Sequence, residues 1–402
     1  MTETTNFSAD MSRASKREMK DGFSNDDICF EVLSRVPTKS LLKSKLVSKK
    51  WHQIISEFSF MRVQSQISKP VISGFFFQEK FQWCEDDIES VSYIPVDSEQ
   101  TIVHNTVLDF LPEKVVLMTS SNGLLCCRSC KTSSHSVVYV CNPTNKQWIT
   151  LKWDGPDNGK GLALAPIGIS ANFRLVNLRQ MEIDSDDDID RLFYLSFEIY
   201  SSSTGEWKTS GDSCVCQYNL FKNVGIYASG VLYWLTDGDE ILMFDVENEV
   251  PRLIKKPTPQ MVCSGVPESC IGETGGQLYY IQISEVGIQV WILEDHYEPR
   301  WVLKNFISLA SMEEENPTIL YNVERKMASR VTVDMTPWMD PLAFNEGLLF
   351  MRVCAKIYLY HLETRNMKEL CTLDRLGPNS LTYPIVLPYN ISLVPLQCSS
   401  TA

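Results

Sequence analysis

The chain has 402 residues, 44% of them hydrophobic and 10% aromatic, which is enough apolar material for a sizeable core in two or three domains. Its net charge of -13 argues against a large phosphate-binding surface, so no nucleic-acid partner is expected. No apolar run approaches the ~20 residues of a membrane span, and no secretory signal is visible. We therefore expect no membrane partner and a cytoplasmic or nuclear protein whose 13 cysteines are reduced thiols.

Charge is unevenly divided along the chain. Residues 1–60 hold 10 basic and 8 acidic residues, a net +2, which leaves -15 for residues 61–402. The polar composition of residues 1–22 predicts a disordered N-terminal tail. Residues 397–402 are expected to be a short C-terminal tail after the β region.

Residues 23–66 have the pattern of a small helical module. Ser24 or Asn25 can cap a first helix whose first turn holds two aspartates. Pro37 ends that helix, because the residue before a proline is disfavoured in the α region.

A second helical stretch is predicted from about Thr38 to Phe58. Its apolar side chains form two ridges, one containing Leu41 and Trp51 and another containing Leu42 and Leu46. Two ridges indicate either a break into two short helices or two different apolar neighbours. About forty residues cannot bury all these side chains alone, so the excess predicts a partner.

The motifs Glu31-Val-Leu-Ser-Arg-Val-Pro37, Lys39-Ser-Leu-Leu and Leu46-Val-Ser-Lys-Lys-Trp51 together resemble an F-box. The resemblance implies a three-helix module that docks on the Skp-type adaptor of a cullin-RING ubiquitin ligase. The residues that it places in the module's core or on the adaptor are Ile28, Val32, Leu33, Val36, Pro37, Leu41, Leu42, Leu46, Val47 and Trp51. Sequence alone does not separate the two groups. A basic rim is expected from Lys39, Lys43, Lys45, Lys49 and Lys50. Phe23-Ser24 stands where many F-boxes have Leu-Pro.

From residue 67 to 396 the pattern changes to short apolar runs separated by turn residues. A glycine followed by an apolar strand recurs at Gly74, Gly123, Gly161, Gly230, Gly276 and Gly347, with gaps of 49, 38, 69, 46 and 71 residues. Blade-type repeats run ~40–50 residues, so the two long gaps require insertions or degenerate repeats. We predict an all-β domain, most simply a β-propeller of about six to eight blades; the alternatives are a β-sandwich or two unrelated β domains.

The β region also resembles a family, the F-box-associated, kelch-like β-propeller of land plants. The resemblance rests on NPTNKQWITL at 142–151, GVLYWLTDGDEILMFDVENE at 230–249 and the ending LPYNISLVPL at 387–396.

Two clusters invite a metal interpretation. The run from Glu182 to Asp190 alternates acids as a calcium loop does, but it lacks that loop's glycine and final glutamate. Cys126 and Cys127 are adjacent on a predicted strand and should point to opposite faces, so they do not readily share a zinc ion. We expect no metal and no cofactor, and the acidic run is predicted to be a solvated loop or an attractor of a basic substrate.

The leading hypothesis is therefore a non-catalytic, substrate-recognition subunit of a Skp-cullin-F-box (SCF) ubiquitin ligase. The helical module would dock on the adaptor, and the propeller would recruit a protein substrate whose identity and binding residues the sequence does not indicate. The alternatives are a propeller scaffold without ligase assembly and, third, a propeller enzyme; no catalytic motif is present.

Overall fold

The computed structural model divides into two compact parts, Met1–Lys69 and Pro70–Ala402, called here the helical domain and the β domain. It describes residues 25–68, 71–78, 91–97, 103–105, 107–130, 136–153, 159–167, 172–183, 191–221, 224–258, 267–330, 338–376 and 384–396. The predicted tails, Phe23-Ser24 and most of the acidic run lie outside these ranges.

The helical domain contains four helices in its described residues: α1 (Asn25–Ser34), α2 (Thr38–Ser44), α3 (Lys49–Ser56) and α4 (Phe58–Ile67). Asp26 and Asp27 lie in the first turn of α1, as expected from the sequence. Pro37 follows the end of α1 and is the residue that precedes α2.

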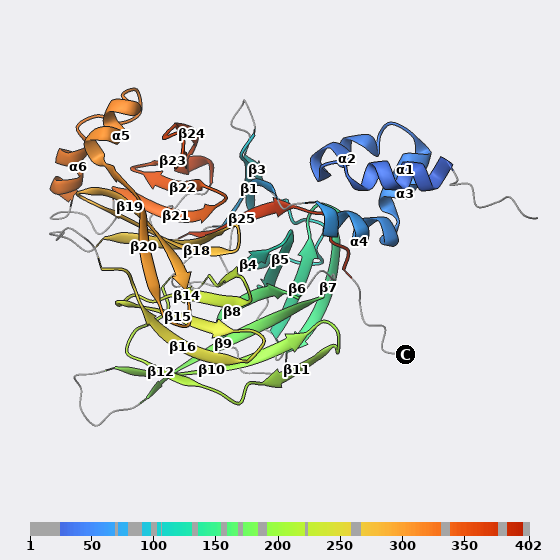
Figure 1. The fold of residues 1–402 in the computed structure, drawn as a ribbon, viewed down its shortest axis with the longest axis horizontal. Coiled ribbons are helices and arrows are strands. Elements are labelled where there is room, and N and C mark those ends of the chain that lie inside the picture. The colour runs from blue at the N-terminus through green and yellow to red at the C-terminus, as the bar shows by residue number, and fades with distance from the viewer. Residues whose placement is uncertain are drawn as a thin grey trace, which may run out of the picture. The chain divides into compact units, whose positions relative to one another are not determined.

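In the β domain, the described strands form five sheets, and the eight-stranded one consists of two four-stranded antiparallel halves (Figure 1). The six antiparallel groups obtained in this way are called blades 1 to 6. Blade 1 contains β25 (Ile385–Ile391), β1 (Val71–Gln78), β2 (Ser92–Pro95) and β3 (His104–Asn105). Blade 2 contains β4 (Val115–Ser121), β5 (Leu124–Ser129), β6 (Ser136–Asn142) and β7 (Gln147–Trp153). Blade 3 contains β8 (Gly159–Pro166), β9 (Phe173–Ile183), β10 (Leu192–Ser201), β11 (Glu206–Thr209) and β12 (Cys214–Cys216).

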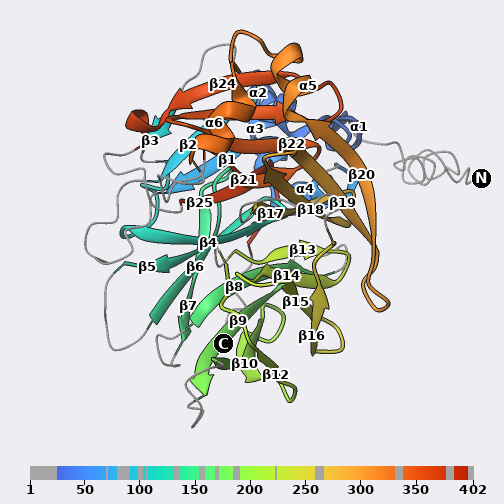
Figure 2. The same ribbon diagram turned by 90° about the vertical axis from the view of Figure 1, so that its left-hand side faces the viewer.

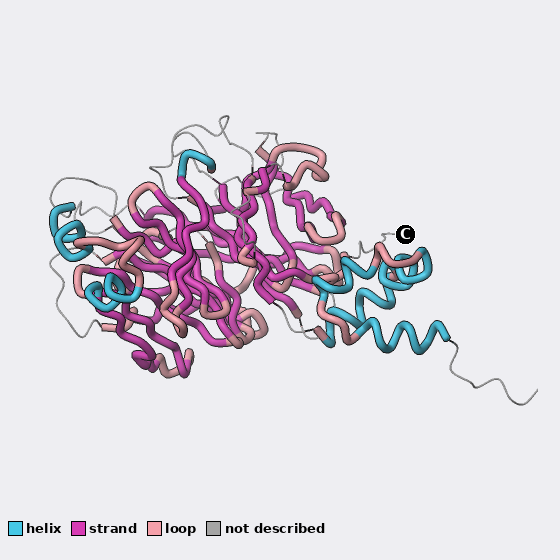
Figure 3. Tube along the Cα trace, turned by 90° about the horizontal axis from the view of Figure 1, so that it is seen from above, coloured by secondary structure: helices cyan, strands magenta, loops and turns pink. Residues whose placement is uncertain are grey.

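Blade 4 contains β13 (Ile226–Ala228), β14 (Val231–Leu235), β15 (Glu240–Asp245) and β16 (Val250–Lys255). Blade 5 contains β17 (Glu268–Thr274), β18 (Gln277–Ser284), β19 (Gly287–Asp295) and β20 (Arg300–Ser308). Helices α5 (Leu309–Glu315) and α6 (Val323–Arg330) follow at the edge of the domain (Figure 3). Blade 6 contains β21 (Met339–Asn345), β22 (Leu348–Val353), β23 (Lys356–His361) and β24 (Met367–Thr372), and ends at a short 3-10 helix, Leu373–Arg375.

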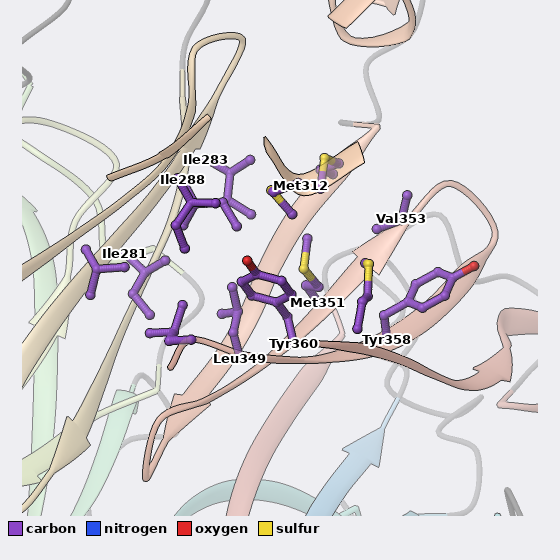
Figure 4. Close-up of a cluster of buried hydrophobic side chains, with 14 of the residues drawn as sticks. Ile281, Ile283, Ile288, Met312, Leu349, Met351, Val353, Tyr358 and Tyr360 are labelled. Atoms are coloured by element: carbon purple, nitrogen blue, oxygen red, sulfur yellow. The ribbon is translucent and has the colours of Figure 1, made fainter. Parts of the chain in front are cut away.

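The blades close into a ring. Six clusters of buried apolar side chains each join one blade to the next in chain order, and the last joins blade 6 to blade 1. In Figure 2 the strands of blade 6 lie next to those of blade 1. Figure 4 shows the cluster between blades 5 and 6, where isoleucines of β18 and β19 face Met351 and Tyr360, with Met312 of α5 beside them. The β domain is a β-propeller, and six blades lie within the predicted range.

This packing explains the near-continuous apolar runs in the sequence, because each blade is buried on both faces. On β18, Tyr279 and Ile281 enter the core shared with blade 6, whereas Leu278 and Tyr280 enter the core shared with blade 4. The same alternation separates Cys126 from Cys127, which lie in the cores on opposite faces of blade 2, as predicted.

The recurrent glycines have two different roles. Gly123, Gly230, Gly276 and Gly347 lie at positive φ in the turns between the first and second strands of their blades, as the turn prediction requires. The prediction is wrong for Gly74 and Gly161, which lie at register shifts inside β1 and β8. A Cβ at Gly74 would lie 2.4 Å from the carbonyl oxygen of Ile94, so close packing and not a turn requires this glycine.

The first and last strands of the domain pair with each other and close the ring. β25 pairs antiparallel with β1 over most of its length. Asn142, from the NPTNKQW stretch, donates through Nδ2 to the carbonyl oxygens of Ser392 (3.0 Å) and Val394 (2.8 Å). The Tyr389 hydroxyl lies 2.8 Å from Thr144 Oγ1. The NPTNKQW stretch and the LPYNISLVPL ending both carry the family resemblance, and they are therefore in contact where β1 and β25 close the ring.

Candidate functional site

The helical domain has a small but complete core. Leu33, Leu41, Ile55 and Phe60 are buried. The Phe30 ring meets the Phe60 ring edge-on, with centroids 5.1 Å apart. The four buried residues come one each from α1, α2, α3 and α4. They are only part of the apolar residues that the sequence places in this domain.

The predicted helix from Thr38 to Phe58 is interrupted. α2 ends at Ser44 and α3 begins at Lys49, where the Ser48 hydroxyl accepts a hydrogen bond of 3.1 Å from the backbone N–H of Trp51. Of the two explanations for the two apolar ridges, the break into two helices is correct. It removes Val47 from the predicted stripe, because Leu46 and Val47 lie in the connection and are 87% and 68% exposed.

The ten predicted site residues divide by burial into three groups. Leu33 and Leu41 are buried in the domain's own core. Val36, Leu42 and Trp51 are half-buried, and Ile28, Val32, Pro37, Leu46 and Val47 are exposed. Ile28 and Val32 are one helical turn apart on α1 and are 52% and 59% exposed. We call Ile28, Val32, Leu46 and Val47 the exposed apolar set.

The predicted basic rim is also divided. Lys39, Lys43, Lys49 and Lys50 are exposed, whereas Lys45 is half-buried and burial lowers its pKa. Lys50 on α3 forms an ion pair with Asp26 on α1, and this hydrogen bond raises the Lys50 pKa. Sequence reasoning missed Asp26 as a partner of Lys50, since the two residues are far apart in the chain.

In the part of the chain that the structure describes, no group of three histidine, cysteine or acidic side chains could hold a metal ion. Cys126 and Cys127 are free, and their pKa values are raised. Burial is the main cause for Cys126, and a hydrogen bond between the Cys127 thiol and Cys141 is the main cause for Cys127. Asp184, Asp186, Asp188 and Asp190 lie outside the described residues. None of the described helices is long and apolar enough to span a membrane.

A small pocket of about 50 Å³ lies near the meeting point of the blades' inner strands. Its lining includes Asn122, Tyr227, Glu273, Asn345 and Asn390, which come from five different blades. This volume is far below the ~300–1,000 Å³ of typical ligand sites.

Comparison with known families agrees with this architecture. Residues 25–62 match the F-box domain, and residues 93–328 match the family described as "F-box protein At3g26010-like, beta-propeller". The second match covers more than half of the chain. The chain belongs to this F-box family.

This F-box protein has similar relatives in Arabidopsis thaliana. It is 27% identical to the F-box protein At5g49610 over 370 residues, which cover 89% of this chain and 92% of the relative. It is 25% identical to the F-box protein At5g07610 over 379 residues, which cover 87% and 86% of the two chains. Both alignments cover most of this chain and most of the relative, and both relatives are F-box proteins.

Proposed function

We propose that this F-box protein is a substrate-recognition subunit of an SCF-type ubiquitin ligase. The helical domain docks on a Skp-type adaptor, and the propeller holds a target protein. The chain performs no covalent step itself. It raises the effective concentration of a target lysine near the ubiquitin-charged enzyme.

The observation that carries this proposal is the exposed apolar set. Leu46 and Val47 have a complete core beside them in the same domain, yet 87% and 68% of their surfaces remain in water. Several strongly exposed apolar side chains in one small domain indicate a docking surface. The exposed lysines Lys43 and Lys49 flank this connection and suit an acidic partner surface.

The test replaces both exposed residues, as Leu46→Asp with Val47→Asp, in the full-length chain. Co-purification with a recombinant Skp-type adaptor should fall at least ~30-fold, because a central interface residue contributes ~2 kcal/mol or more. The thermal unfolding midpoint should stay unchanged, since neither side chain is part of the core.

The matched control is Tyr321→Asp, whose side chain in the propeller is 68% exposed, as is that of Val47. The control should retain the adaptor fully. Undiminished adaptor binding by the double variant would contradict the proposed docking surface, and adaptor binding without recruitment of a cullin would contradict ligase assembly.

A further inference from the structure

A pocket of about 600 Å³ lies between blades 4 and 5 of the propeller. It is formed by the turn from β14 to β15, by Lys255 at the end of β16 and the residues up to Thr258 that follow it, and by residues of β17 and β18. The volume lies within the range of typical ligand sites, unlike that of the small pocket near the inner strands. Phe221, Tyr280 and Pro257 give the pocket apolar walls.

One wall of this pocket continues into a polar row across blade 5. Ser269, Gln282, Gln289 and Phe306 are direct cross-strand neighbours on β17, β18, β19 and β20. The adjacent row on the same face is Ile271, Tyr280, Trp291 and Leu303, which packs in the core with blade 4. The polar row therefore begins where the apolar contact between the two blades ends.

The two glutamines of this row have buried side chains with incomplete hydrogen bonding. Gln282 and Gln289 are each 2% exposed, and the Oε1 atom of each has no hydrogen-bond partner among the described residues. A buried polar atom without a partner is destabilising. Two such atoms lie on neighbouring strands, and Gln282 is also part of the pocket lining.

A buried glutamine elsewhere in the propeller provides the contrast. Gln78 is 1% exposed, donates through Nε2 to the carbonyl oxygen of Val115 at 2.8 Å and accepts at Oε1 from the N–H of Leu117 at 2.8 Å. Its carboxamide is satisfied by the backbone of the next blade.

The other side of the pocket supplies a hydrogen-bond donor. Lys256 donates through Nζ to the carbonyl oxygen of Thr236 at 2.9 Å, and burial lowers its pKa to about 8. The ammonium group has further N–H donors for an incoming acceptor. At the far end of the polar row, Phe306 is 42% exposed and offers an apolar contact.

We propose that this pocket binds an extended peptide segment of the target protein. Backbone N–H groups of the segment donate to Oε1 of Gln282 and Gln289, a backbone carbonyl accepts from Nζ of Lys256, and an apolar side chain packs on Phe306. An extended peptide fits because it presents donors and acceptors alternately along its length. This inference rests on the proposed function, for which it names the target-binding surface.

The experiment screens a phage-displayed library of random peptides against the immobilised full-length chain. Enriched peptides are then synthesised and their affinities measured by fluorescence anisotropy for the wild type, Gln282→Met and Gln289→Met. Both variants should bind the peptides at least tenfold more weakly. Gln277→Met should bind like the wild type, because Gln277 lies at the exposed, opposite end of the same strand.

Thermal unfolding of the same variants separates binding from folding. Gln282→Met should not lower the midpoint, since the oxygen that it removes has no partner among the described residues. Gln78→Met should lower it, because it leaves a buried N–H and a buried C=O of blade 2 unpaired. A Gln282→Met variant as unstable as Gln78→Met would show a structural role and overturn the proposal.

Two other results would also overturn it. If no peptide is enriched, or if enriched peptides bind Gln282→Met and the wild type equally, the row binds only water. Because the assay contains no adaptor, failure of adaptor docking leaves this result unaffected. Failure of peptide binding likewise leaves the docking test intact.

Discussion

Burial gives neighbouring leucines of the helical domain opposite roles. Leu41 is fully buried, whereas Leu46, five residues later, is 87% exposed. Leu41→Ala should therefore destabilise the helical domain by ~2–5 kcal/mol through the cavity it leaves. Local unfolding measured by hydrogen exchange of α1–α4 should increase, and adaptor binding should weaken only as a consequence. Unchanged exchange in these helices would contradict the assignment of Leu41 to the core.

The sequence predicted the set of ten F-box residues but could not divide it. Apolar residues three and four apart in a helix indicate a stripe, and a stripe can face either a core or a partner. The division depends on the break at Lys45–Ser48, where a serine cap starts a new helix. Ser48 followed by Lys-Lys-Trp is a local capping signal, and it could have revealed the break.

At the scale of strands, blades 5 and 6 approach unusually closely. β17 and β21 pair in parallel at Gly272–Phe344 and Glu273–Asn345, which joins the two blades into one sheet. A Cβ at Gly272 would lie 2.1 Å from the carbonyl oxygen of Phe344, a backbone atom that cannot move independently. Gly272→Ala should therefore destabilise the propeller by ~1–3 kcal/mol, the usual range for overpacking.

Urea unfolding followed by tryptophan fluorescence measures this loss. Gly211→Ala is the matched control, because a Cβ there meets no atom within 4 Å. Equal stability of the two variants would contradict the close approach of β17 and β21.

The irregular spacing of the repeats also has its explanation at the scale of elements. The gap between Gly276 and Gly347 contains α5 and α6, and the gap between Gly161 and Gly230 contains the long strands β9 and β10 with the additional β12. The sequence indicated that insertions were needed. It did not indicate helices in the first case, since α5 and α6 are short and their sequences are largely polar.

For the whole propeller, burial of thiols and phenols predicts alkaline unfolding. Burial raises the pKa values of Cys371, Tyr280 and Tyr360 to about 12. In the unfolded chain these groups ionise from about pH 9 upward. The stability that each contributes is fully present below that pH and is lost as the pH rises toward 12, at up to ~1.4 kcal/mol per pH unit for each group.

Urea unfolding at about pH 8, 9 and 10 measures the effect. Lys256 acts in the opposite direction, because its lowered pKa favours the folded state as the pH rises above about 8. The comparison is therefore made between the wild type and Cys371→Ala, which should lose less stability between about pH 9 and 10. Equal losses in the two proteins would contradict the burial of the Cys371 thiol.

The closure of the ring has a consequence for synthesis of the protein. β1 is among the first strands to leave the ribosome, but β25, its partner, is the last. At roughly 5–20 residues per second, β1 waits tens of seconds with an unpaired edge. The helical domain precedes β1 and has a core of its own, so it can fold during this interval. A nascent chain could therefore present Leu46 and Val47 to an adaptor before its propeller exists.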